Sequence, residues 1–78
     1  MPKLPPIKAQ ELLKLLIKIG FSKHHQAGSH IQIKHADGRR TTIPYHPKKE
    51  IRRGTLAAIL KDISIEEEEF IKLRKKYN

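Results

Sequence analysis

The sequence predicts an α+β domain in which one helix, three antiparallel strands and a second helix follow one another, with a short third helix at the end. Three observations lead to this prediction. Apolar residues recur at helical spacing near both ends of the chain, and they alternate with polar residues in the middle. Turn residues separate these segments. A length of 78 residues suits one domain, so residues 1–78 are expected to form a single unit.

The first helix is predicted from Ile7 to Ile19. Its apolar residues fall at positions i, i+3, i+4 and i+7, and they are Leu12, Leu15, Leu16 and Ile19. Pro6 suits the first helical position. Gly20 is expected to end the helix in the left-handed conformation.

In the middle of the chain, the alternation of apolar and polar residues predicts three strands. A short extended segment runs from Phe21 to Gln26, with Lys23 and His25 expected on the same face as Phe21. A turn at 27–29 precedes a strand at 30–35, in which Ile31 and Ile33 point inward and His30 points outward.

Two registers are open for the hairpin between strands 30–35 and 39–45. A two-residue Asp-Gly turn would place Ile43 on the face opposite Ile31. A three-residue loop at 36–38, with Gly38 in the left-handed conformation, pairs residue 31 with 43 and residue 33 with 41. Only this second register gathers the apolar residues on one face, so we expect it. It sets His30 beside Pro44.

The remaining third of the chain predicts a basic connector and two helices. Pro44 and Pro47 end the third strand, because proline cannot extend a ladder. Residues 48–53 connect it to a helix opened by Gly54 and Thr55, with the apolar stripe Leu56, Ile59, Leu60 and Ile63. Ser64 and Glu67 match a capping box for a third helix. Its inner stripe is Phe70, Leu73 and Tyr77.

The charge of the chain is large and uneven. Residues 1–61 contain 13 of the 17 Lys and Arg and three of the eight Asp and Glu, a net +10, whereas residues 62–78 carry four bases and five acids, a net −1. General solubility does not need such an excess. An anionic membrane surface is a weaker partner, because no segment joins a broad apolar face to a basic one. The charge therefore favours nucleic acid as the partner.

Composition excludes several other classes. The chain has no cysteine, which removes disulfides, thiolate metal sites and cysteine nucleophiles. No apolar run approaches the roughly 20 residues that span a bilayer, and no secretory pattern opens the chain. We expect a cytoplasmic protein without a membrane partner, a metal site or a cofactor. Histidines 24, 25 and 35 are expected to be solvated.

His30 is the candidate catalytic residue, because an exposed imidazole on a basic protein is suited to proton transfer at a phosphate polymer. A solvent-facing strand histidine without a role is the plain alternative. Gly28 and Ser29 either approach a phosphate with their backbone or form an ordinary turn. His46 is a second candidate acid–base group or phosphate contact, and equally a plain surface residue. The remaining predicted phosphate contacts are basic, namely Lys34, Arg40, Lys48, Lys49, Arg52 and Arg53, and the amides that open the second helix add to the last four.

A set of short motifs, in this order and spacing, resembles the HicA family of bacterial and archaeal toxins. They are Gly20-Phe21, Gln26-Ala27-Gly28-Ser29-His30, Ile43-Pro44-Tyr45-His46, Glu50-Ile51, and Gly54-Thr55-Leu56 with Ile59-Leu60. The resemblance implies a double-stranded-RNA-binding-like fold and a toxin that cleaves mRNA independently of the ribosome. It also implies a HicB-type antitoxin partner and carries the family's essential histidine over to His30. His25 and Ala27 depart from the basic residues that the family often has there.

The resemblance implies an endoribonuclease. Because RNA supplies its own 2′-hydroxyl nucleophile, one histidine together with Lys and Arg can suffice for cleavage without a metal, and we expect His30 to supply the acid–base catalysis. The alternative is a protein that binds RNA without cleaving it and has the same fold. A DNA-binding regulator is a third, although no helix-turn-helix spacing supports it.

Overall fold

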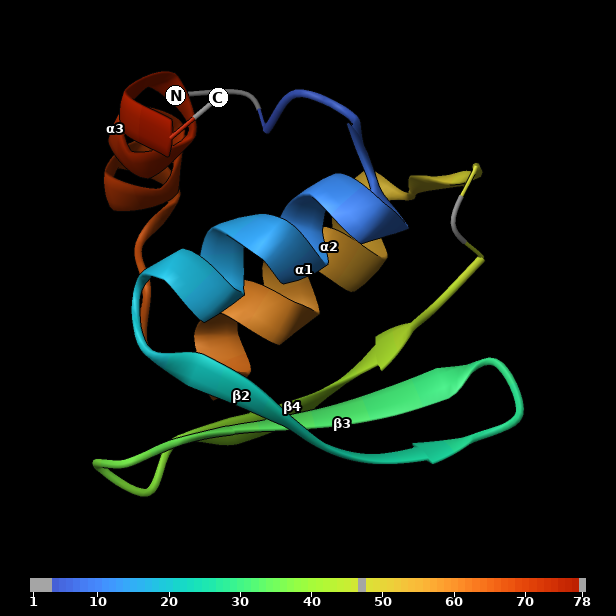
Figure 1. Cartoon of the computed structure of the whole chain (residues 1–78). Helices are drawn as coiled ribbons and strands as arrows, with labels where there is room; N and C mark the ends of the chain where they lie inside the picture. Colours follow the sequence, from blue (N-terminus) through green and yellow to red (C-terminus); the bar gives the residue numbers. More distant parts are fainter. Residues whose placement is uncertain (1–3, 47, 78) are drawn as a thin grey trace.

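The computed structural model describes residues 4–46 and 48–77. Two helices cover one face of a three-stranded antiparallel sheet with the order β2-β3-β4, and the third helix packs against both of them (Figure 1). The elements are β1 (Ile7–Lys8), α1 (Ala9–Lys18), β2 (Phe21–Ala27), β3 (His30–His35), β4 (Arg40–Pro44), β5 (Glu50–Ile51), α2 (Arg53–Asp62) and α3 (Glu67–Tyr77). The predicted α+β class, with its α-β-β-β-α order and added C-terminal helix, is confirmed.

The core lies between the sheet and the two helices. Ile31, Ile33 and Ile43 of the sheet are buried, as are the leucines predicted for α1 and the stripe Leu56, Ile59, Leu60 and Ile63 of α2. Phe70 of α3 is also fully buried. Each of these side chains contributes about 1.5–3 kcal/mol by leaving water. The alternation along β3 leaves the opposite face of the sheet exposed to solvent.

The hairpin between β3 and β4 has the predicted register. Ile31 pairs with Ile43, and His30 pairs with Pro44. Gly38, in the loop at 36–38, has a φ of +100°, which a glycine adopts at little cost. The side-chain pattern therefore fixed the register through burial of one face.

The beginning of α1 differs from the prediction. Ile7 and Lys8 form β1, whose partners are Ile51 and Glu50 of β5, and the helix starts only at Ala9. Pro6 consequently precedes a strand and does not open the helix. The second sheet also lies inside the connector predicted at 48–53, while Pro47 falls outside the described residues. Two-residue strands carry too few side chains to show a period.

β2 contains a β-bulge that the sequence did not predict. Lys23 pairs with Ile33, but the next pair is His25 with Gln32, so His24 is an extra residue on β2. Directly paired residues of antiparallel strands share a face. His25 therefore lies on the outer face with Gln32, and its expected place beside Phe21 was wrong.

The capping box predicted for α3 is also wrong. Ser64 has a φ of +56° and is the residue that ends α2, because its N–H donates to the Lys61 carbonyl and the Ile65 N–H donates to the Leu60 carbonyl. This pair of hydrogen bonds is the Schellman motif. α3 begins at Glu67, and α2 begins at Arg53, one residue before the predicted opening.

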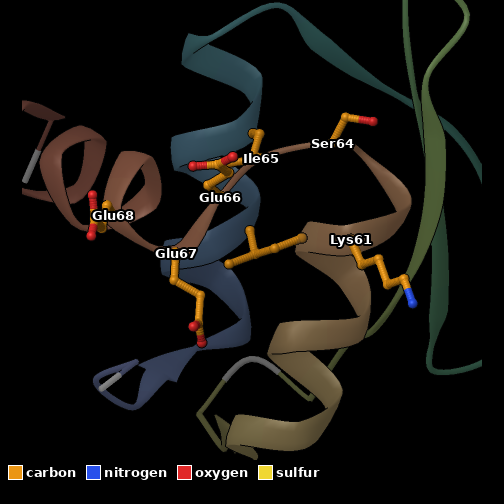
Figure 2. A pocket seen from close by; sticks show the side chains of 7 residues that line it. Lys61, Ser64, Ile65, Glu66, Glu67 and Glu68 are labelled. Carbon is orange, nitrogen blue, oxygen red and sulfur yellow. The ribbon is translucent and has the colours of Figure 1, made fainter. Parts of the chain in front are cut away.

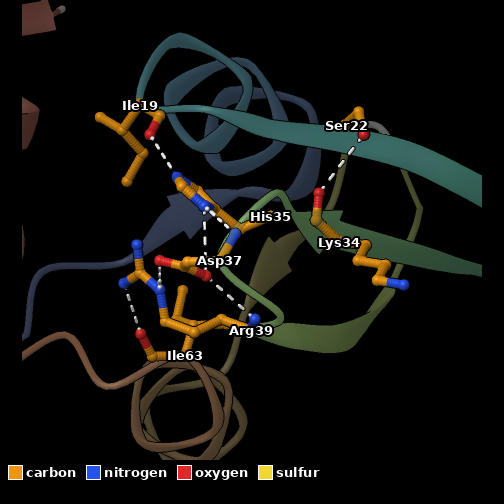
Figure 3. Close-up of polar contacts among 7 residues, drawn as sticks. All are labelled: Ile19, Ser22, Lys34, His35, Asp37, Arg39 and Ile63. Carbon is orange, nitrogen blue, oxygen red and sulfur yellow. Dashed lines mark hydrogen bonds and ion pairs between the residues drawn. The ribbon is translucent and has the colours of Figure 1, made fainter.

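His35 joins the loop at 36–38 to the end of α1 (Figure 3). Its Nδ1 accepts a hydrogen bond of 3.1 Å from the Asp37 N–H and also lies 3.1 Å from Asp37 Oδ1, and its Nε2 lies 3.2 Å from the Ile19 carbonyl oxygen. The ring also meets the Phe21 ring edge to face, with centroids 4.9 Å apart. His35 is half-buried, so its predicted solvation was wrong.

Arg39 connects the same loop to the end of α2. Its Nε donates to Asp37 Oδ2 at 2.8 Å, and its Nη1 donates to the Ile63 carbonyl at 2.8 Å, at the end of α2 (Figure 3). Hydrogen bonds from Arg39, the backbone N–H first, hold the pKa of the Asp37 carboxyl below its ordinary value of 3.8. The loop is thereby attached to both helices that cover the sheet.

Candidate active site

His30 opens β3 on the outer face of the sheet, where no helix covers it (Figure 1). Its side chain is exposed, and among the described residues its ring takes part in no hydrogen bond. Its neighbours on the two adjacent strands are Ala27 and Pro44, which have no side-chain donor or acceptor. Both ring nitrogens are therefore open to a ligand.

The turn before His30 is a two-residue hairpin loop made of Gly28 and Ser29. Gly28 has a φ of +57°, and a Cβ atom there would meet nothing within 4 Å, so the backbone conformation and not space calls for glycine. A glycine first and a residue of ordinary φ second is the pattern of a type II′ turn. The Gln26 side-chain amide donates to the Gly28 carbonyl, and the Tyr45 N–H donates to the Ser29 carbonyl. The turn interpretation is thus sufficient for these two residues, and their contact with phosphate stays a prediction.

A pocket of about 220 Å³ begins at Pro44, the residue paired with His30. It is lined by Pro44, His46, Lys49, Glu50, Ile51, Arg52 and Thr55. The β1–β5 ladder positions this lining, because the Ala9 N–H donates to the Lys49 carbonyl and Ile51 is buried. Two cations face one carboxylate here, so the pocket has the charge that a phosphate requires.

The beginning of α2 adds to this positive end. Arg52 is its N-cap residue, no side chain among the described residues caps it, and its first turn contains no acid. The first N–H groups of a helix lack intrahelical partners and carry the positive end of the helix dipole. Thr55, in that first turn, lines the pocket and was not predicted as a site residue. Its hydroxyl group next to the start of a predicted helix is the feature of the sequence that could have indicated it.

The other predicted basic residues lie apart from this pocket. Lys34 and Arg40 pair with each other on the outer face, four residues along β3 from His30, or roughly 13 Å. Lys48 is exposed outside the pocket lining, and Arg53 lines a neighbouring hollow with Leu4, Pro6, Glu50, Ile51 and Arg52. The structure therefore brings together His46, Lys49 and Arg52 and separates the rest.

A larger hollow, of about 630 Å³, lies between the end of α2 and the start of α3 (Figure 2). Its charged side chains are Lys61 and the three glutamates 66–68, so its charge opposes a polyanion. Among residues 4–46 and 48–77, no three His, Asp or Glu side chains are grouped to hold a metal ion. No helix in that part of the chain is long and apolar enough to cross a membrane.

A family profile described as "HicA toxin of bacterial toxin-antitoxin" matches residues 9–65, most of the 78-residue chain. The chain belongs to the HicA toxin family. The HicA match runs from the first residue of α1 to the end of the Schellman motif, so it includes His30 and the pocket, and α3 lies beyond it. Family membership makes the chain the toxin of a toxin–antitoxin system, with a cognate antitoxin as its partner. None of the curated proteins compared with the chain matches it.

Proposed function

We propose that this HicA-family toxin is an endoribonuclease that cleaves mRNA in the cytoplasm without the ribosome and without a metal ion, with His30 as an acid–base catalyst. The observation that carries the proposal is the placement of His30. It is an exposed imidazole, free of hydrogen bonds within the described residues, one strand away from a basic pocket. Cleavage requires removal of the 2′-hydroxyl proton and protonation of the leaving 5′-oxygen.

The basic pocket serves in this proposal to bind a phosphate of the RNA next to the scissile one. Lys49 and Arg52 supply the charge, His46 adds a ring nitrogen, and the start of α2 adds unpaired N–H groups. Lys34 and Arg40 bind a more distant phosphate along the outer face. Such contacts give affinity and salt dependence but no choice of base. Gly28 and Ser29 hold the backbone of the turn close to the scissile phosphate, and Lys48 and Arg53 extend the positive field.

We further propose that the antitoxin is a HicB-type protein that covers the outer face and His30. The net charge of +9 favours an acidic surface on that partner, since complementary charge speeds association and occlusion of the face blocks RNA. Coexpression with the product of a neighbouring reading frame tests this proposal. The pair should copurify, and RNA cleavage should stop in the complex.

The catalytic role is tested with purified protein, a long RNA and EDTA. The wild type and the control variant His24→Ala should cleave the RNA, whereas His30→Ala should not, although it still binds RNA and its antitoxin. His24 is the matched control because it is an exposed histidine on the neighbouring strand. Intact RNA with every variant, combined with salt-sensitive binding, would instead identify a non-catalytic RNA-binding module. Full cleavage by His30→Ala would refute the assignment of the histidine.

A further inference from the structure

The bulge in β2 changes which histidine faces the candidate site. Without it, strict alternation from Phe21 would turn His25 toward the inner face. The extra residue His24 reverses the alternation, so that His25 pairs with Gln32 on the outer face. Bulges occur next to active sites, where they redirect a side chain.

His25 is then a diagonal neighbour of His30. The two pairs that follow the bulge on the outer face are His25 with Gln32 and Ala27 with His30. Diagonal neighbours on adjacent antiparallel strands have Cα atoms roughly 7–8 Å apart, and their Cβ atoms are somewhat closer. Both histidines are exposed, and the residue beside His30 on β2 is an alanine, whose methyl group leaves the surface between the two rings open.

We propose that His25 is the second acid–base catalyst and works with His30 on opposite sides of one RNA phosphate. The proposal rests on the proposed function. In the reaction one neutral imidazole takes the proton of the 2′-hydroxyl, and the 2′-oxygen forms a bond to phosphorus. The bond from phosphorus to the 5′-oxygen breaks, and the other ring, as imidazolium, gives its proton to that oxygen. The products are a 2′,3′-cyclic phosphate and a 5′-hydroxyl, and the two rings together return to their starting proton count.

The geometry suits this division of work. The entering and leaving oxygens lie on opposite sides of phosphorus, so a base and an acid must approach from two directions, each within about 3 Å of its oxygen. The two rings lie at opposite corners of a group of four residues whose other corners are Ala27 and Gln32, so a phosphate can lie between the rings above Ala27. A single histidine would have to serve both oxygens.

The test measures kcat/KM against pH for a short RNA with one cleavage site. The wild type should give a bell-shaped profile, because one ring must be neutral and the other charged. His25→Ala should lower the rate by about 100-fold or more and lose one limb of the profile. His25→Gln, which keeps a polar side chain in the strand, should behave in the same way. His24→Ala should stay within about twofold of the wild type.

A second substrate, in which sulfur replaces the 5′-oxygen, assigns the acid. Sulfur leaves without protonation, so the variant that lacks the acid, either His25→Ala or His30→Ala, should regain nearly the wild-type rate, while the other stays slow. If the wild type cleaves RNA and His30→Ala does not, but His25→Ala and His25→Gln keep the wild-type rate and profile, the role of His25 is refuted alone. If the wild type cleaves no RNA, the proposed function fails and the role of His25 fails with it.

Discussion

Replacing Gly20 with alanine should destabilise the protein for two separable reasons. Gly20 has a φ of +110°, and a Cβ atom there would lie 2.5 Å from His35 Nε2. The positive φ costs an alanine about 1–2 kcal/mol. The His35 ring is also held by the Asp37 N–H and by the Phe21 ring, so it can move away only by giving up its hydrogen bond to Ile19, which is worth about 0.5–1.5 kcal/mol.

The two contributions together predict a loss of about 2–3 kcal/mol in the free energy of unfolding, which is a large part of the 5–15 kcal/mol typical of small domains. In a domain of this size the melting temperature should fall by about 10–20 °C. Urea unfolding and thermal melting followed by circular dichroism measure both quantities.

A matched control separates the backbone cost from the contact with His35. Gly38 has a similar φ of +100° but open space around it, so Gly38→Ala should show the backbone cost alone. Gly20→Ala should therefore cost about 1 kcal/mol more than Gly38→Ala, and that excess should vanish when Gly20→Ala is made in a His35→Ala background. An excess that persists without the imidazole would refute the reasoning.

Three further outcomes are expected. Ser64→Gly should raise the free energy of unfolding by about 1 kcal/mol, seen as a higher urea midpoint, because glycine adopts the φ of +56° without strain; no gain would mean that Ser64 is not strained. Asp37→Asn should lower stability at pH 7, and its difference from the wild type should close as the pH falls through the lowered pKa of Asp37, because a carboxyl with a lowered pKa stabilises the fold only above it. Urea titrations between pH 2 and 7 test this, and a gap that widens in acid would contradict it. The double variant Lys49→Gln, Arg52→Gln should bind single-stranded RNA with a weaker salt dependence. The slope of log affinity against log salt should fall by about 1.4, since each phosphate contact contributes roughly 0.7. Lys72→Gln on α3 is the control, and an unchanged slope in the double variant would move the phosphate contacts elsewhere.

The burial pattern predicted the elements that pack in the core. The register of β3 with β4 followed from the need to gather Ile31, Ile33 and Ile43 on one face, and the C-terminal end of α1 followed from Gly20. These features depend on side chains whose alternation or spacing extends over several residues. They can therefore be predicted from the segment itself, without knowing which elements pack against it.

The features that the sequence did not predict depend on contacts between distant segments. β1 and β5 have two residues each and exist because they pair with each other. Serine is a residue type that commonly begins a helix, but Ser64 belongs to the hydrogen-bonded motif that ends α2. The bulge follows no local rule, since residues 22–26 are all polar and either alternation fits them equally well. The candidates His30, His46, Lys49 and Arg52 could therefore be chosen from their residue types, whereas the separation of His30 on the outer face from the pocket that His46, Lys49 and Arg52 line could not.

The ladder between β1 and β5 also has a consequence for motion. It consists of two residue pairs that close a long loop of chain around α1 and the main sheet, so its hydrogen bonds gain little against the loss of chain entropy, and the burial of Ile7 and Ile51 supplies most of what holds it. A ladder with so few hydrogen bonds opens more readily than the long ladders of the main sheet. The amide hydrogens of the ladder should exchange with solvent far sooner than those of β3, and each opening releases the backbone that carries Lys49 and Arg52. In the proposed function, the contact of Lys49 and Arg52 with an RNA phosphate would then break and re-form many times while the main sheet and His30 stay in place.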